Sequence, residues 1–71
     1  SLRIRLGRLY RVLKNIEKRF ASSRNTDHLL TELNDLEKRI ERLNVSLIQS
    51  KELYDLRSHI ALVRDQLKQA K

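Results

Sequence analysis

Apolar residues that alternate three and four positions apart recur along this chain in three separate stripes. This spacing places side chains on one face of an α-helix. It therefore predicts three amphipathic helices, at about residues 3–21, 28–45 and 51–69. The stripes are formed by Leu2, Leu6, Leu9, Leu13, Ile16 and Phe20, then Leu29, Leu33, Leu36, Ile40, Leu43 and Leu47, then Leu53, Leu56, Ile60, Val63, Leu67 and Ala70.

The stripes change phase at two places, and each change predicts a turn. Residues 22–27 are rich in Ser, Asn, Thr and Asp, which favour turns and helix caps. We expect Thr26 or Asp27 to cap the second helix. The second change of phase predicts a turn at residues 46–50.

Three amphipathic helices joined by short turns predict an all-α fold, an up-down-up antiparallel bundle. The alternatives are a helical hairpin or one long coiled coil, because a stutter within a continuous helix changes the phase in a similar way. A chain of 71 residues forms at most one small domain. The mid-helix stripe positions should form the centre of its core: Leu36, Ile40, Leu56, Ile60 and Val63.

The net charge of +7 comes entirely from the first third of the chain, which has eight bases and one acid in residues 1–24. Four of these bases, Arg8, Arg11, Lys14 and Lys18, share the side of the first helix that faces away from its apolar stripe. We call them the basic ridge. Glu17 lies off the ridge, so no acid interrupts it. This pattern is typical either of a solvated face or of a surface that binds anions.

The third helix has unusual residues outside its apolar stripe. Tyr54, Ser58, Ala61 and Leu62, here called the outer patch, stand where a solvated face more often has Lys, Glu and Gln. One interpretation is scattered exposed apolar residues, which are common. The other is a contact surface for a protein partner or a second copy of the chain.

The sequence offers few groups for catalysis or metal binding. It has no Cys and no Gly-rich phosphate loop. It has only two histidines, His28 and His59, and we expect neither to have a carboxylate at ligand spacing. We interpret both as ordinary polar residues, and Asp35 and Arg39 as a helical i,i+4 ion pair. The prediction is a non-enzyme without metal or cofactor.

The run Glu52–Leu67, ELYDLRSHIALVRDQL, resembles the last motif in the C-terminal helical tail of TAXI-type TRAP transporter solute-binding subunits. Leu9-Tyr10-Arg11 and Leu36-Glu37 resemble earlier parts of that tail. The family often has an aromatic residue at the position of Val12 and a proline at that of Ser46. The resemblance covers most of the chain, and its specific part is residues 52–67.

This resemblance implies that a ligand-binding domain and a membrane segment precede the chain, which begins at Ser1 and is expected to be a fragment of a longer protein. It also implies a location on the cytoplasmic face of the bacterial inner membrane. The basic first helix agrees with the excess of Lys and Arg in cytoplasmic segments. The ligand-binding residues of the family belong to the preceding domain, so none carries over.

Three functions compete at this point. The first is a non-catalytic, membrane-proximal interaction module of a solute transport protein, with the basic ridge on an anionic membrane and a protein partner or homo-oligomer at the outer patch. The second is a structural coiled-coil oligomerisation segment. The third is a small nucleic-acid-binding domain, which the charge permits but the lack of a recognition motif and of stacking aromatics disfavours.

Overall fold

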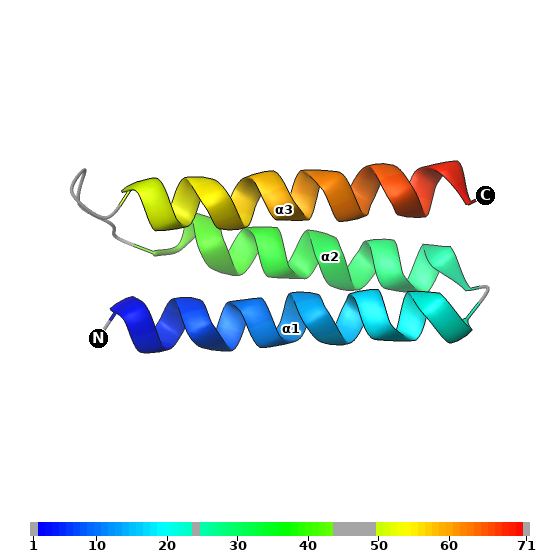
Figure 1. Ribbon diagram of the computed structural model, residues 1–71, viewed down its shortest axis with the longest axis horizontal. Helices are drawn as coiled ribbons and strands as arrows, with labels where there is room; N and C mark the ends of the chain where they lie inside the picture. The colour runs from blue at the N-terminus through cyan, green and yellow to red at the C-terminus, as the bar shows by residue number, and fades with distance from the viewer. Residues whose placement is uncertain (1, 24, 44–49, 71) are drawn as a thin grey trace.

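The computed structural model describes residues 2–23, 25–43 and 50–70. These residues form three helices, α1 (Leu2–Ser22), α2 (Thr26–Glu41) and α3 (Ser50–Gln69), and no strand. Consecutive helices run in opposite directions, so that the start of α1 and the end of α3 lie at opposite ends of a body of 38 × 18 × 16 Å (Figure 1). The predicted all-α fold of three helices is confirmed for the described residues, and the contacts among the helices are consistent with the predicted up-down-up antiparallel bundle.

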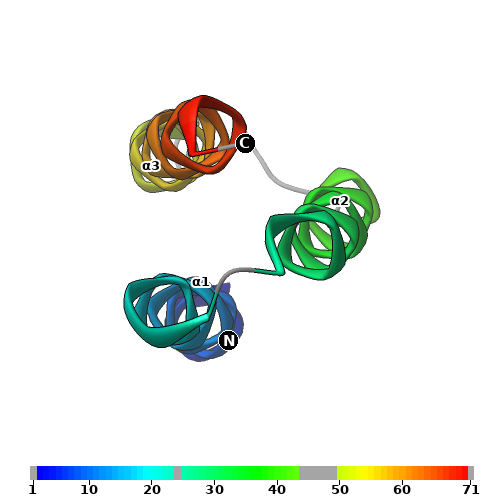
Figure 2. The same cartoon turned by 90° about the vertical axis from the view of Figure 1, so that its right-hand side faces the viewer.

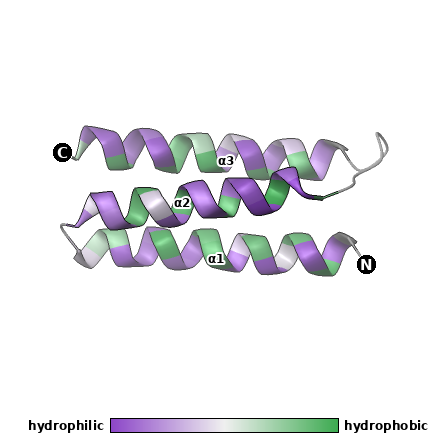
Figure 3. Ribbon diagram, turned by 180° about the vertical axis from the view of Figure 1, so that it is seen from behind, coloured by the Kyte–Doolittle hydropathy of each residue, from purple (hydrophilic) through white to green (hydrophobic). Residues whose placement is uncertain are grey.

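Viewed end-on, the three helices stand at the corners of a triangle (Figure 2), and each contacts both of the others. Contact between α1 and α3 excludes a single long coiled coil and a two-helix hairpin for the described residues. Apolar and hydrophilic segments alternate along each helix (Figure 3), and the three stripes meet at the centre. The buried core comprises Leu6, Leu9, Leu13, Ile16, Leu29, Leu33, Leu36, Ile40, Leu56, Ile60, Val63 and Leu67.

The five residues predicted for the centre of the core are all buried, with at most 2% of each exposed. The ends of the stripes are less covered, because fewer neighbouring side chains surround them there. Phe20, Leu43 and Leu53 are only partly buried against the core. Ala70 is exposed and lies beyond the end of α3, so its prediction as a stripe residue was wrong.

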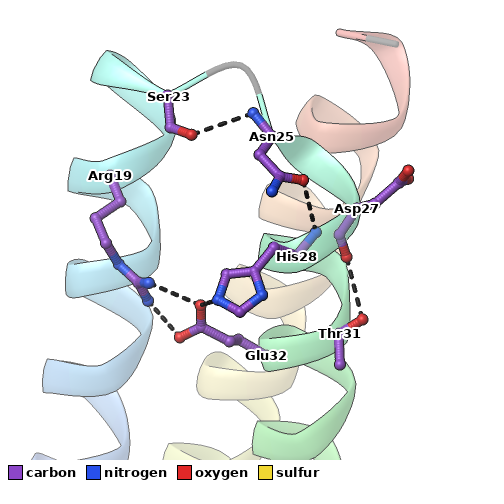
Figure 4. A network of polar contacts seen from close by, with 7 residues as sticks. All are labelled: Arg19, Ser23, Asn25, Asp27, His28, Thr31 and Glu32. Carbon is purple, nitrogen blue, oxygen red and sulfur yellow. Dashed lines mark hydrogen bonds and ion pairs between the residues drawn. The ribbon is translucent and has the colours of Figure 1, made fainter.

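The turn between α1 and α2 is shorter than predicted, since Ser22 ends one helix and Thr26 begins the next. Asn25 caps α2 by accepting a hydrogen bond at Oδ1 from the backbone N–H of His28, at 3.2 Å (Figure 4). The prediction of Thr26 or Asp27 as the cap was therefore wrong. Both residues lie in the first helical turn, where Asp27 interacts favourably with the helix dipole.

Helix α2 ends at Glu41 rather than near residue 45. The backbone N–H of Leu43 donates to the carbonyl of Ile40 at 3.0 Å, an i→i−3 bond that tightens the last turn and ends the helix. The turn predicted at residues 46–50 lies outside the described residues, except for Ser50, where α3 begins.

Candidate functional site

The basic ridge lies on the outward face of α1, and all four of its side chains are exposed. At 100° per residue these positions centre about 180° from the buried stripe of the same helix. Arg8, Arg11 and Lys18 form no ion pair with a described residue. Lys14 lies 3.7 Å from Glu17, three positions later, so an acid that the sequence places off the ridge approaches one of its four bases.

An exposed apolar residue accompanies the ridge. Ile4 is 60% exposed, the only large apolar side chain of α1 so open among the described residues. It precedes Arg11 by seven positions, which puts the two side chains within about 20° of each other around the helix axis. Ile4 was not predicted as a surface residue because it belongs to no apolar stripe. An apolar residue outside the stripe and among the bases was the signal that could have identified it.

The formal charges are distributed unevenly among the helices. Helix α1 carries seven bases and one acid, α2 carries two bases and five acids, and α3 carries four bases and three acids. Acids of α2 form ion pairs with both neighbouring helices: Glu32 with α1 and Glu37 with α3. Among the described residues, no acid of α2 forms an ion pair with the four bases of the basic ridge.

Between α1 and α2, Arg19 forms a two-pronged ion pair with Glu32 (Figure 4). Its Nη1 donates to Oε2 at 2.7 Å and its Nη2 to Oε1, while Nε2 of His28 lies 3.1 Å from Oε2. The hydrogen bonds from Arg19, helped by the charges of Arg19 and His28 and opposed by desolvation, lower the pKa of Glu32. The same hydrogen bonding raises the pKa of Arg19.

Between α3 and α2, Arg64 makes the equivalent connection. Its Nη1 donates to Oδ1 of Asn34 at 2.7 Å, and its Nη2 pairs with Glu37. These contacts tie α2 to both neighbours along their flanks. They leave the outward faces of α1 and α3 uncovered.

Between α3 and α1, Nε2 of His59 lies 3.3 Å from Oε1 of Glu17, and its ring meets the Tyr10 ring edge-on at 6.3 Å. The expectation that neither histidine has a carboxylate at ligand spacing was wrong. His28 has Glu32 one turn later in its own helix, and His59 has Glu17 across an interface. Neither pair extends to a metal site, since the described residues contain no group of three or more potential His, Cys, Asp or Glu ligands.

The outer patch lies on the outward face of α3, with all four residues exposed. Tyr54 is 70% and Leu62 is 53% exposed, and Ile4 of α1 is the only other exposed large apolar residue among the described ones. Its proposed role as a protein contact stays a prediction.

No family model, curated protein or solved structure matches this chain. The resemblance to the TAXI-type tail thus rests on the sequence motifs alone. No helix within the described ranges is both long and apolar enough to span a bilayer.

Proposed function

We propose that this domain is a non-catalytic helical module that rests on an anionic membrane surface through the outward face of α1. The observation that carries the proposal is the position of the basic ridge. Its four exposed bases stand on the side of α1 that the bundle does not use, and Ile4 is exposed among them.

Simple energetics support binding in the interface rather than insertion. Each base near an anionic surface contributes about 1 kcal/mol, so four contribute several, and salt weakens the attraction over a Debye length. The apolar stripe of α1 is already buried in the core, which leaves Ile4 as the apolar side chain able to enter the headgroup region. Attraction should therefore be mainly electrostatic.

Nucleic acid offers the same phosphate chemistry and is the main competitor. Two features of the outward face of α1 favour lipid. Asn15 is the only amide side chain of α1, which gives this helix little means to read base edges. An exposed isoleucine among the bases suits the acyl boundary of a bilayer better than a phosphate backbone.

The sequence resemblance adds a biological setting to this proposal. It implies a module of a bacterial solute transport protein, next to the cytoplasmic face of the inner membrane. In that setting the outer patch on α3 would face away from the bilayer, toward a protein partner or a second copy.

Co-sedimentation with lipid vesicles tests the proposal. The domain should bind vesicles that contain anionic lipid, bind neutral vesicles weakly, and dissociate as salt rises above about 150 mM. Changing all four ridge residues to Gln should abolish binding without unfolding the domain. The matched control removes two Lys and two Arg from exposed positions of α2, its C-cap and α3: Lys38, Arg42, Arg57 and Lys68.

The control variant has the same net charge as the ridge variant, so equal loss of binding in both would overturn the assignment to α1. Competition between vesicles and nucleic acid then distinguishes membrane binding from nucleic-acid binding. If short duplex DNA removes the domain from vesicles at equal charge concentration, the nucleic-acid function replaces the membrane function. If neither surface binds, the ridge is a solvated face and the domain is structural.

A further inference from the structure

The interface between α1 and α2 differs at its two ends. Near the turn, Arg19 is matched by Glu32. Toward the other end lies a hollow of about 170 Å³ that is lined by three arginines and two leucines: Arg5, Arg8, Leu9, Arg39 and Leu43. We call it the arginine hollow. Two of its arginines come from α1 and the third comes from α2.

The three arginines of the hollow lack acidic partners. None of them forms an ion pair with a described residue. Asp35 lies one turn before Arg39 and was expected to pair with it, but the two side chains form no ion pair. By contrast, Arg19 at the other end of this interface and Arg64 between α3 and α2 each contact a glutamate of α2. Like charges that converge without a counter-charge create a positive potential that a bound anion would relieve.

The chemistry of the hollow favours phosphate over other anions. A guanidinium presents a planar fork of donors that binds phosphate oxygens in pairs, and three exposed arginine residues line this one hollow. Leu9 and Leu43 supply the apolar part of its lining. Three positive charges match a doubly charged phosphate better than a singly charged phosphodiester.

The geometry points to the arginine hollow as a binding site for a phosphomonoester group, carried by a lipid headgroup or by a soluble compound. The headgroup form rests on the proposed membrane function, whereas the soluble form stands without it. The site requires the folded bundle, because Arg39 is contributed by α2. Arg39 is also the one arginine of the hollow on a different helix from the ridge, so changing it tests the hollow and leaves the ridge intact.

Inorganic phosphate is the first probe. In a phosphate-free buffer at pH 7.5 with about 150 mM NaCl, titrated phosphate should shift the Nε–Hε NMR signals of Arg5, Arg8 and Arg39. Arg39→Lys keeps the charge but loses the fork, and should weaken phosphate binding about tenfold. The control, Arg42→Lys, makes the same exchange at an exposed arginine just after α2 that does not line the hollow, and should change nothing.

Vesicles are the second probe and identify the source of the group. Vesicles with phosphatidic acid are compared with vesicles of phosphatidylglycerol adjusted to the same surface potential. A headgroup site predicts tighter binding to phosphatidic acid in the wild type and in Arg42→Lys, and equal binding of both lipids in Arg39→Lys. A shift with inorganic phosphate but no lipid preference assigns the site to soluble phosphomonoesters.

Two outcomes overturn the inference. One is the absence of both a phosphate-induced shift at the three arginines and a preference for phosphatidic acid. The other is an Arg39→Lys variant that binds phosphate as the wild type does, which would reduce the hollow to diffuse charge. Failure of the proposed membrane function has a different signature, because the domain would then bind neither kind of anionic vesicle.

Discussion

Helices α1 and α3 contribute equally to the core of the bundle, but their outward faces differ. They have 21 and 20 residues, and each buries four stripe residues at the centre of the bundle. Each is tied to α2 by an arginine–glutamate pair. Their outward faces differ in charge and polarity, because α1 presents the basic ridge and α3 presents the outer patch.

The basic ridge lowers the stability of α1 rather than raising it. Bases three or four positions apart, such as Arg8 and Arg11 or Lys14 and Lys18, repel one another and cost a helix about 0.2–0.5 kcal/mol per pair. The first turn of α1 also has no acid to interact with the helix dipole. Helix α3 folds onto the same core with mixed charges. Because the bundle does not require the ridge, we propose a binding role for it.

The largest effects should come from the buried stripes, where the two helices are equivalent. Leu13→Ala in α1 and Ile60→Ala in α3 each remove a side chain that is 0% exposed. Each should lower the free energy of unfolding by about 2–5 kcal/mol, measured by urea denaturation, which is much of the stability of a small domain. If one variant unfolds like the wild type, the two helices are not matched as scaffold.

A smaller effect of opposite sign is expected at Gly7, the only glycine of the chain. It lies inside α1 with no positive φ, and an added Cβ would meet no heavy atom within 4 Å. Gly7→Ala should stabilise the domain by about 1 kcal/mol, because glycine loses more backbone freedom in a helix. A lower urea midpoint would mean that α1 needs a bend or close contact here that α3 does not.

The flank of α1 should make stability depend on pH. Because Arg19 lowers the pKa of Glu32, this carboxylate stabilises the fold above its unfolded pKa, about 4.3. That stabilisation is lost as pH falls through the lower, folded pKa. Glu32→Gln should therefore lose less stability than the wild type on acidification from pH 6 to about 3, whereas Glu41→Gln, at an exposed position of the same helix, should follow the wild type. Identical acid profiles for all three proteins would show that the pair contributes nothing in solution.

The smallest effect on stability is expected at the outer patch. Replacing Ala61 and Leu62 with Glu should change the free energy of unfolding by about 0.5 kcal/mol or less per position, since both are exposed. If the patch is a contact surface, sedimentation will show concentration-dependent association of the wild type and none of the variant. A wild type that stays monomeric and captures no partner leaves Tyr54 and Leu62 as scattered exposed residues.

The sequence predicted the features that depend on helical periodicity. The existence of three helices, the buried centre around Ile60 and the exposure of the ridge all follow from positions three and four apart. The periodicity failed at the ends of α2, because Leu43 continues the stripe after the helix has ended, and because Asn25 precedes two equally plausible caps.

The features that were missed depend on how the helices are set against one another. The contact of His59 with Glu17 requires the register of α3 against α1, and the arginine hollow requires Arg39 to meet Arg5 and Arg8. No spacing within one helix contains that information. Ile4 is the exception, since its place among the bases was readable from the sequence.

The most direct test of the membrane assignment asks which face of the folded domain meets the bilayer. The chain has no cysteine, so single labels can be placed at Asn15→Cys on the outward face of α1 and at Ser58→Cys on that of α3, both exposed. Neither change alters the charge. With an environment-sensitive fluorophore on anionic vesicles, and at a protein concentration too low for self-association, the label at position 15 should become shielded from an aqueous quencher while the label at position 58 stays fully accessible. Equal shielding at both positions, or shielding at 58 alone, would contradict the account.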